Sequence, residues 1–420
     1  MDRKNNLIKK IFRFWKILGP GLVTGASDDD PSGIATYSQA GAQYGFATLW
    51  TALITFPLMA SIQGMCARIG LVTKHGLAGT LKKYYSKPVL YLMLLFSFPA
   101  IVMNIGADIA GMGAVGKLLF PSIQASWFCV LFTILLLVMI VFLPYQKIAA
   151  VLKYLCIVLL VYLIIPFLHK QDWLAVLKST FIPTIKFDKN FVSILVAILG
   201  TTISPYLFFW QATMEVEDQK ITKSKLVVDK RVIDDMKKDV NFGMLFSNLV
   251  MFFMILTTGS VLFNGGIHKI DTVEQAAQAL KPLAGNFAYL LFAVGIIGTG
   301  LLAIPVLSGS LSYIVSESFG WKTGLDKKFY NAKIFYIIIA ISLILGLSLD
   351  YIGLSPIKAL IYSAILYGLT APILIVIILH ISNNKKIMGK HTNNKLSNIL
   401  GFATLALMTV AAGVLIYMQF

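Results

Sequence analysis

The sequence predicts an all-α integral membrane protein with about eleven transmembrane helices, two of them interrupted near the middle. Three observations predict it. Of the 420 residues, 57% are hydrophobic and only 13% are charged. The apolar residues fall into successive stretches that are long enough to cross a bilayer. Polar and helix-breaking residues interrupt the first and the sixth of these stretches.

The composition excludes a soluble globule, because soluble proteins carry charges on ~25% of their residues. The net charge of +17 would indicate a nucleic-acid partner in a soluble protein. Here we expect the basic residues in cytoplasmic loops, and no nucleic acid as partner. The three cysteines, Cys66, Cys129 and Cys156, lie in or beside apolar runs without CxxC spacing. We interpret them as packing residues rather than disulfides or zinc ligands.

A helix needs about 20 mostly apolar residues to cross the hydrocarbon core. The candidate spans are 17–41, 46–68, 88–115, 126–145, 148–168, 191–215, 241–264, 285–315, 333–350, 355–380 and 397–418. No linker is long enough to hold a soluble domain, so we expect residues 1–420 to form a single transmembrane domain. The longest polar stretches are 169–190 and 216–240, and the second is predicted as a solvated cytoplasmic helix.

The distribution of basic residues predicts the orientation. With a cytoplasmic N-terminus, 28 of the 36 Lys and Arg residues fall in cytoplasmic segments. Such residues collect on the cytoplasmic side, so we expect the N-terminus inside and, after eleven spans, the C-terminus outside. The basic start runs into Gly19 and Pro20 without a cleavage site, which is not typical of a signal peptide. A bacterial inner (cell) membrane fits these features.

The first span contains the run GASDDDPSG. One alternative ends the span at Gly25 and makes the acidic run an exterior loop, but only the longer segment reaches spanning length. Pro31 removes a backbone donor and Gly33 relaxes the chain, so together they should unwind the helix and free its carbonyl oxygens. Asp30 is best placed to point into the gap and bind a cation, while the two preceding aspartates cap the turn or face an aqueous vestibule.

The sixth span carries a second interruption, with Gly200, Thr201, Thr202, Ser204 and Pro205 inside an apolar helix. An ordinary proline kink is the alternative. Matching interruptions in two halves point to an inverted-repeat transporter with its site at the midplane. We therefore predict a LeuT-like 5+5 inverted repeat, with repeat one at about 17–168, repeat two at about 191–380 and an extra helix at about 397–418.

The stretch GPGLVTGASDDDPSGIATYSQAGAQYGFATLW resembles the first span of the NRAMP family of divalent-metal transporters, and the likeness extends along the chain by span count and position. That family carries Asp-Pro-Gly-Asn in its first helix and Met-Pro-His in its sixth. The resemblance implies that Asp30 is the principal metal ligand, assisted by backbone carbonyls of Ser27 and Thr201. The chain departs from the pattern in three places, where Gly33 replaces the asparagine, Ser204 the methionine and Tyr206 the histidine.

The third span reads FPAIVMNIGADIAGMGAVG, and a family aspartate that serves proton movement matches Asp108. Two family glutamates fall on Gly111 and Ile101, so the resemblance implies that the proton route is lost. This pattern is similar to the NRAMP-related branch that includes magnesium transporters, whose transport is uncoupled from protons. Alternatively, Asp108, one turn after Asn104, is a structural carboxylate bonded to a neighbouring helix.

Loss of the thioether leaves carboxylate, hydroxyl and carbonyl oxygens, which suit Mg²⁺, Ca²⁺ and Mn²⁺. The smaller side chains leave room for the water molecules that Mg²⁺ retains. The predicted metal ligands are Asp30, Ser27, Gly33, Thr201 and Ser204, and the predicted lining residues are Asp29, Asp108, Tyr206 and Asn104. We expect alternating-access uptake of Mg²⁺, with Mn²⁺, and no proton coupling, since about 100 mV inside-negative favours divalent entry by ~4.6 kcal/mol. An Fe²⁺ or Mn²⁺ transporter of the same family is the alternative.

Other functional classes have less support. No nucleophile motif, P-loop or dinucleotide fingerprint occurs, so we expect no enzyme activity, no catalytic residue and no cofactor, the metal ion being the substrate. An organic-substrate carrier, a channel and a metal sensor stay open. The expected partners are the cation and the lipid bilayer, without an obligate protein partner. Ser308, Ser310 and Ser312 indicate close helix packing, whereas Tyr362 and Ser363 are candidates to complete the site when it occludes.

Overall fold

The computed structural model describes residues 19–144, 147, 161–168, 172–221, 228–349, 353 and 355–418. Several predicted features therefore lie partly outside the described residues. They are the basic N-terminus with the start of the first span, residues 148–160 of the fifth span, and residues 169–171 and 222–227 of the two polar stretches.

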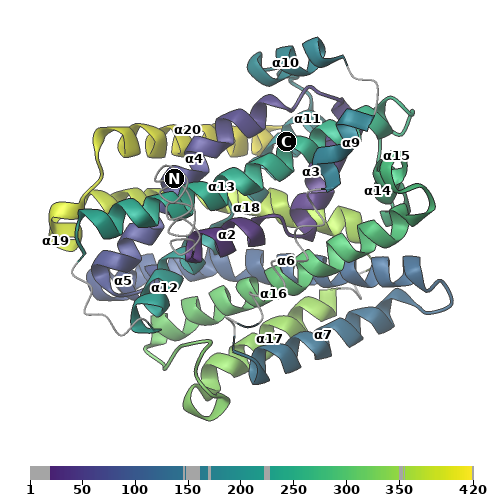
Figure 1. The fold of residues 1–420 in the computed structure, drawn as a ribbon. Helices are drawn as coiled ribbons and strands as arrows, with labels where there is room; N and C mark the ends of the chain where they lie inside the picture. Colours follow the sequence, from purple (N-terminus) through teal and green to yellow (C-terminus); the bar gives the residue numbers. More distant parts are fainter. Residues whose placement is uncertain are drawn as a thin grey trace, which may run out of the picture.

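The described residues form helices and no strand (Figure 1). The first span is divided into α2 (Pro20–Asp28) and α3 (Pro31–Tyr44), and the sixth into α11 (Lys189–Thr202) and α12 (Pro205–Ile221). The long unbroken helices are α4 (Trp50–Thr73), α6 (Lys87–Leu119), α7 (Ala125–Phe142), α13 (Lys230–Thr258), α16 (Ala288–Phe319), α17 (Lys333–Ser348), α18 (Pro356–Asn383) and α20 (Lys395–Tyr417). The shorter ones are α5 (Leu77–Tyr84), α9 (Val161–Leu168), α10 (Trp173–Phe181), α14 (Val273–Ala277), α15 (Lys281–Ala284) and α19 (Lys385–Met388).

The predicted membrane fold is confirmed. Within the described ranges, eight helical segments are long and apolar enough to cross a membrane, and α17 is a shorter apolar helix. The broken first span, the fifth span with α9, and α17 occupy the three remaining positions of the predicted series. Helix α13 continues into a π-helical turn at Gly259–Phe263. Several predicted ends stop a few residues early, as in α4, α6 and α12, because these helices continue past the apolar core.

The predicted separate cytoplasmic helix over 216–240 is wrong. Helix α12 continues to Ile221, and α13 begins at Lys230, so the charged residues on both sides of 222–227 extend two spanning helices. Asp229 caps the second of these helices by accepting a hydrogen bond of 2.9 Å from the N–H of Val232. The cap satisfies a backbone donor that has no partner within the helix.

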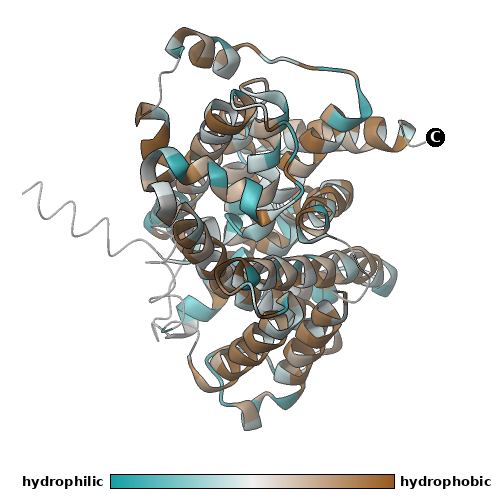
Figure 2. Ribbon diagram, turned by 90° about the vertical axis from the view of Figure 1, so that its right-hand side faces the viewer, coloured by the Kyte–Doolittle hydropathy of each residue, from teal (hydrophilic) through white to brown (hydrophobic). Residues whose placement is uncertain are grey.

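The ribbon of the outer helices is coloured mainly for hydrophobic residues (Figure 2). Exposed isoleucines recur along α17, at Ile334, Ile337, Ile341 and Ile344. In a soluble protein this surface would be an association site, but in a membrane it faces hydrocarbon. Many of the buried positions are instead polar, and those at the two helix breaks include Asp28, Asp29, Asp30, Thr201 and Ser204.

The predicted alternation of the loops between two sides fits the packing. Helices α5 and α19 lie at one end of the bundle and α14 and α15 at the opposite end (Figure 1). The N–H of Gly79 on α5 donates a 2.8 Å hydrogen bond to Glu317 near the end of α16. Arg68, near the end of α4, donates a hydrogen bond to Asn393. The loops that we expect on the cytoplasmic side therefore contact neighbouring helix ends and one another.

Two glycines allow the first span to approach α13 closely. A Cβ atom on Gly25 would lie 2.1 Å from the carbonyl oxygen of Gly243, and one on Gly243 would lie 2.0 Å from that of Gly21. Both distances are far below van der Waals contact. Small residues of this kind let membrane helices pack backbone against backbone. This contact fixes α2 and positions the break that follows it.

Candidate functional site

The break in the first span lies at Asp29 and Asp30, between α2 and α3. Asp30 has an extended backbone, and its Oδ1 accepts a 2.7 Å hydrogen bond from the N–H of Gly33. Pro31 takes the first helical position, where its missing N–H costs no hydrogen bond. The prediction that Gly33 lies in the unwound segment is wrong, because Gly33 is in the first turn of α3. The capping residue is Asp30 itself rather than either preceding aspartate.

The sixth span is also broken, and the alternative of a simple proline kink is wrong. Helix α11 ends at Thr202, and α12 begins at Pro205. The hydroxyl of Ser204 turns back to the end of α11, where it donates to the carbonyl oxygens of Thr201 and, at 3.2 Å, Gly200. The Ser204 oxygen thus lies at the gap between the two half-helices.

The two breaks are in contact with each other. The hydroxyl of Tyr206 donates a 2.8 Å hydrogen bond to the carbonyl oxygen of Ser27, at the last turn of α2. A Cβ atom on Gly33 would lie 3.3 Å from Oγ1 of Thr201. Because a carbonyl oxygen has two lone pairs, the oxygens of Ser27 and Thr201 keep acceptor capacity for a further partner. The five predicted ligands, Asp30, Ser27, Gly33, Thr201 and Ser204, are therefore neighbours in the fold.

A hydrogen-bonded chain links Asp30 to two other helices. Nδ2 of Asn104 on α6 donates 2.8 Å to Oδ2 of Asp30, and Ser363 on α18 donates 2.8 Å to Oδ1 of Asn104. Ser32 lies 3.1 Å from Ser363 through the two hydroxyl oxygens. Of the two tenth-span candidates, Ser363 joins the site. Tyr362 is 47% exposed and lines a different cavity.

Asp108 is fully buried on α6, one turn after Asn104. Neither of its carboxylate oxygens has a hydrogen-bond partner among the described residues, although the N–H of Ser32 and the carboxylate of Asp30 are near enough to act on it electrostatically. Both neighbours belong to the break of the first span or the start of α3, so Asp108 borders the site.

The other two aspartates face α13. Oγ of Ser247 donates 2.6 Å to Asp28 and lies 3.4 Å from an oxygen of Asp29. The second oxygen of each carboxylate has no partner in the described part of the chain. Sequence reasoning missed Ser247, because a lone serine in an apolar helix carries no local signal.

The electrostatics of this region favour a cation. Asp28, Asp29, Asp30 and Asp108 are each at most 2% exposed. Among the described residues, Arg68 is the one buried basic side chain, and it bonds Asn393 instead. Burial of uncompensated charge is costly, so this group of carboxylates calls for a positive ligand or for protons.

Hydrogen bonds tie both half-helices of the first span to their neighbours. On the α2 side, Asp239 of α13 accepts hydrogen bonds from the N–H groups of Gly19 at 2.8 Å and Gly21 at 2.6 Å. On the α3 side, Gln39 accepts a 2.9 Å bond from the N–H of Ile270, and both residues line an outer cavity of about 590 Å³. Asp30 itself is 2% exposed, so an ion reaches it only after the surrounding side chains or helices move.

A model of the family described as natural resistance-associated macrophage protein-like, Nramp, matches residues 21–418. The chain belongs to the Nramp family. It is 23% identical to the divalent metal cation transporter MntH of Caldanaerobacter subterraneus subsp. tengcongensis, over 99% of this chain and 97% of that protein. It is 27% identical to the MntH protein of Verminephrobacter eiseniae, over 94% of this chain and 87% of that protein.

Solved transporter structures share the fold of this chain. The manganese transporter of Eremococcus coleocola superposes with a TM-score of 0.75 at 18% identity, over 95% of this chain and 86% of that one. The nucleobase-cation-symport-1 family transporter Mhp1 superposes with a TM-score of 0.53 at 12% identity, over 95% of this chain and 92% of that one. The predicted LeuT-like architecture with broken first and sixth helices is confirmed.

Proposed function

We propose that this Nramp protein is a secondary transporter for uptake of a divalent metal cation by alternating access, with Mg²⁺, and also Mn²⁺, as substrate. The observation that carries the proposal is the pair of helix breaks meeting around Asp30, a buried carboxylate with carbonyl and hydroxyl oxygens beside it. Relatives along nearly the whole chain are named divalent metal cation transporters. An unwound segment inside a membrane protein is tolerated where it lines a site or pathway.

The proposed metal site is formed by Asp30, Ser27, Gly33, Thr201 and Ser204. Asp29, Asp108, Tyr206 and Asn104 are proposed to surround the ion. Asp30 contributes the negative charge, Ser27 and Thr201 contribute carbonyl oxygens, and Ser204 contributes a hydroxyl. Gly33 contributes space, since its N–H is engaged by Asp30.

The choice of Mg²⁺ rests on the hardness and size of this donor set. Every proposed donor is an oxygen, which suits hard cations. Mg²⁺ sheds its water reluctantly and binds through one or two carboxylates with retained waters. Small residues at Gly33 and Ser204 provide room for such waters once the site opens. Manganese is the second candidate substrate, because the superposed Nramp neighbour is named a manganese transporter.

We propose that transport is not coupled to protons. Ile101, at one position of a family glutamate, is a fully buried apolar residue. At Gly111, the other position, a Cβ atom would lie 3.2 Å from a methyl group of Leu360, so the surroundings are apolar. The membrane potential alone favours divalent entry by ~4.6 kcal/mol at about 100 mV.

We also propose a bacterial cell-membrane location with the N-terminus in the cytoplasm and the C-terminus outside. The support is the count of basic residues together with the grouping of α5, α19 and the end of α16 at one end of the bundle. Fusion of a reporter that is active only outside the cell to the C-terminus tests this. An inactive reporter, with an active one fused between α14 and α16, would contradict the C-terminal assignment.

The deciding experiment is uptake into proteoliposomes with Mg²⁺, Mn²⁺ and Fe²⁺ compared side by side and with the internal pH monitored. Saturable Mg²⁺ entry without acidification is expected. Asp30→Asn, which keeps the size of the side chain but not its charge, should abolish entry. The matched control Glu274→Gln removes an exposed carboxylate on α14 and should leave uptake unchanged. Mn²⁺ or Fe²⁺ entry that millimolar Mg²⁺ fails to inhibit would overturn the magnesium assignment.

A further inference from the structure

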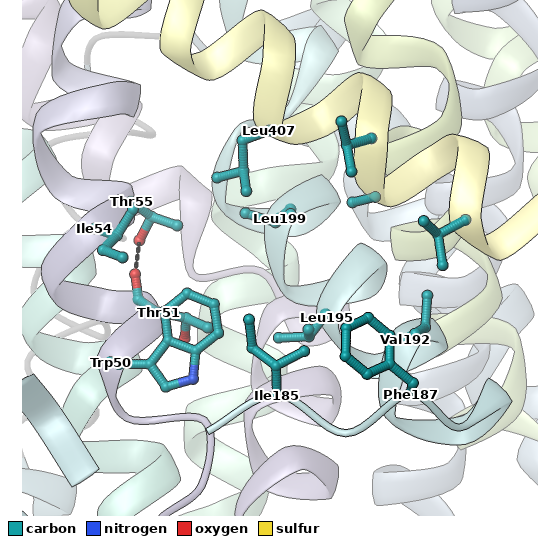
Figure 3. A pocket seen from close by; sticks show the side chains of 13 residues that line it. Trp50, Thr51, Ile54, Thr55, Ile185, Phe187, Val192, Leu195, Leu199 and Leu407 are labelled. Atoms are coloured by element: carbon teal, nitrogen blue, oxygen red, sulfur yellow. Dashed lines mark hydrogen bonds between the residues drawn. The ribbon is translucent and has the colours of Figure 1, made fainter. Parts of the chain in front are cut away.

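An apolar cavity of about 190 Å³ lies between α4, α11 and α20, distinct from the site at Asp30 (Figure 3). The chain leading into α11 closes one side of it with Ile185 and Phe187. The floor is buried, with Leu199 5% exposed, whereas the rim is open, with Val410 63% exposed. The cavity is therefore a recess in the surface that faces the membrane.

The lining of this recess suits a hydrocarbon chain. Its two threonines turn their hydroxyls to the protein, Thr51 to the carbonyl of Thr48 at 2.6 Å and Thr55 to Asn248 at 2.8 Å. The other lining residues are Leu, Ile, Val, Ala, Phe and Trp. Apolar cavities of about 150 Å³ stay dry and take apolar ligands, so a recess of this size and lining should exclude water and accept methylene groups.

Trp50, the first residue of α4, forms part of the wall of the recess and is 8% exposed. Figure 3 shows its ring beside Ile185 in this wall. Its indole Nε1 is buried and does not reach the surface of the recess, so Trp50 lines the recess with ring carbons. Tryptophan rings are enriched where a bilayer meets water.

Basic residues flank the same segment. Lys186 lies between the lining residues Ile185 and Phe187, and its Nζ is 5.7 Å from the ring centroid of Tyr44. Lys189 begins α11, one turn before Val192. Both lysines are exposed, whereas the acidic neighbour Asp188 is engaged in capping α11 through Phe191 at 2.9 Å. The rim therefore attracts an anionic headgroup.

We propose that this recess binds one phospholipid, with an acyl chain in the cavity against the ring of Trp50 and the phosphate near Lys186. The recess is bordered by Val192, Leu195 and Leu199 of α11, the half-helix that ends beside Thr201. A lipid chain here therefore supports the half-helix that reaches the second break. The proposal is independent of which ion is carried.

Native mass spectrometry of the intact protein, purified in mild detergent and supplied with a defined phosphatidylglycerol, tests this. The wild type should retain one phospholipid per chain. Leu407→Trp fills the recess and should abolish retention of the phospholipid. Phe402, on the outer face of the same helix, is 56% exposed, and Phe402→Trp should leave retention unchanged.

A second measurement serves if Leu407→Trp fails to fold. A phospholipid brominated along its acyl chain should quench part of the tryptophan emission of the wild type, and the quenched part should be missing in Trp50→Phe. Retention of detergent alone, a second copy of the chain in place of lipid, or equal lipid retention by Leu407→Trp and Phe402→Trp would overturn the proposal. None of these readouts requires transport activity.

Discussion

The side-chain amide of Asn104 donates a 2.8 Å hydrogen bond to Oδ2 of Asp30, joining α6 to the break in the first span. The other carboxylate oxygen, Oδ1, accepts from the N–H of Gly33. Both bonds favour the ionised carboxylate, and both fix its orientation before any cation arrives. Each oxygen keeps free lone pairs, so a cation can bind without breaking either bond.

Replacing Asn104 by leucine should weaken ion binding. Asp30 would lose a donor inside a buried site, and hydrogen bonds to charged groups contribute about 1.5–3 kcal/mol, or roughly tenfold or more in affinity. We expect a corresponding rise in the KM of proteoliposome uptake. Asn383→Leu, at the exposed end of α18, is the control. An unchanged KM in Asn104→Leu would argue that the hydrogen bond from Asn104 does not help Asp30 to bind the ion.

Asp108→Asn should reduce uptake less than Asp30→Ala, which should abolish uptake while leaving expression intact. Asp108 has no hydrogen-bond partner to lose among the described residues, and it is not one of the proposed ligands. Initial uptake rates, corrected for the amount of protein in the vesicles, test the order. Equal loss in both variants would show that Asp108 is a ligand or a required carrier of protons.

Ser204→Cys should shift the ion preference from Mg²⁺ towards Mn²⁺ or Cd²⁺. The substitution exchanges a hard oxygen for a soft sulfur with little change in size, and softer ligands favour transition metals. Competition of Mg²⁺ uptake by Mn²⁺ and Cd²⁺ measures the shift. Ser308→Cys makes the same change at a buried position on α16, where the hydroxyl bonds Ile304, and should have no effect. A shift in both variants would argue against Ser204 as a ligand.

Asp239→Ala should release the start of α2. Its carboxylate accepts from the N–H groups of Gly19, Gly21 and, at 3.1 Å, Leu22. Hydrogen exchange of a peptide covering 19–28, in nanodiscs, should become faster because these donors lose their acceptor. Asp235→Ala, which removes a largely exposed ion pair with Lys238, should leave the exchange of this peptide unchanged. Unaltered exchange in Asp239→Ala would mean that another contact holds α2.

Gly25→Ala should destabilise the protein by about 3 kcal/mol or more, because the added methyl group meets backbone atoms that cannot turn away. The contact is with the carbonyl of Gly243, at 2.1 Å from the ideal Cβ position. Gly64→Ala on α4 meets no atom within 4 Å and should be tolerated. Thermal unfolding of both variants in detergent measures the difference. Equal melting temperatures would show that α2 and α13 can separate without loss of stability.

Local rules account for what could be predicted of the fold. An aspartate directly before a proline is a natural start of a helix, and both Pro31 and Pro205 begin new half-helices. The apolar stretches predicted the spans. They did not predict how far the helices extend, because charged residues such as those after Lys230 continue a helix beyond the apolar core. The expected unwinding at Gly33 was also wrong, because Asp30 caps α3 and Gly33 lies in the first turn of that helix.

The sequence by itself determined that this chain crosses a membrane, that its first and sixth helices break, and that Asp30 stands at a break. Each of these follows from neighbouring residues, through hydrophobicity, helix propensity and proline geometry. The tertiary structure alone decided that Ser363 bonds Asn104 across 259 positions and that Ser247 bonds Asp28 across 219. Such pairs depend on which helix faces pack together, because buried polar groups must find partners wherever the fold brings them, and no local pattern encodes that choice.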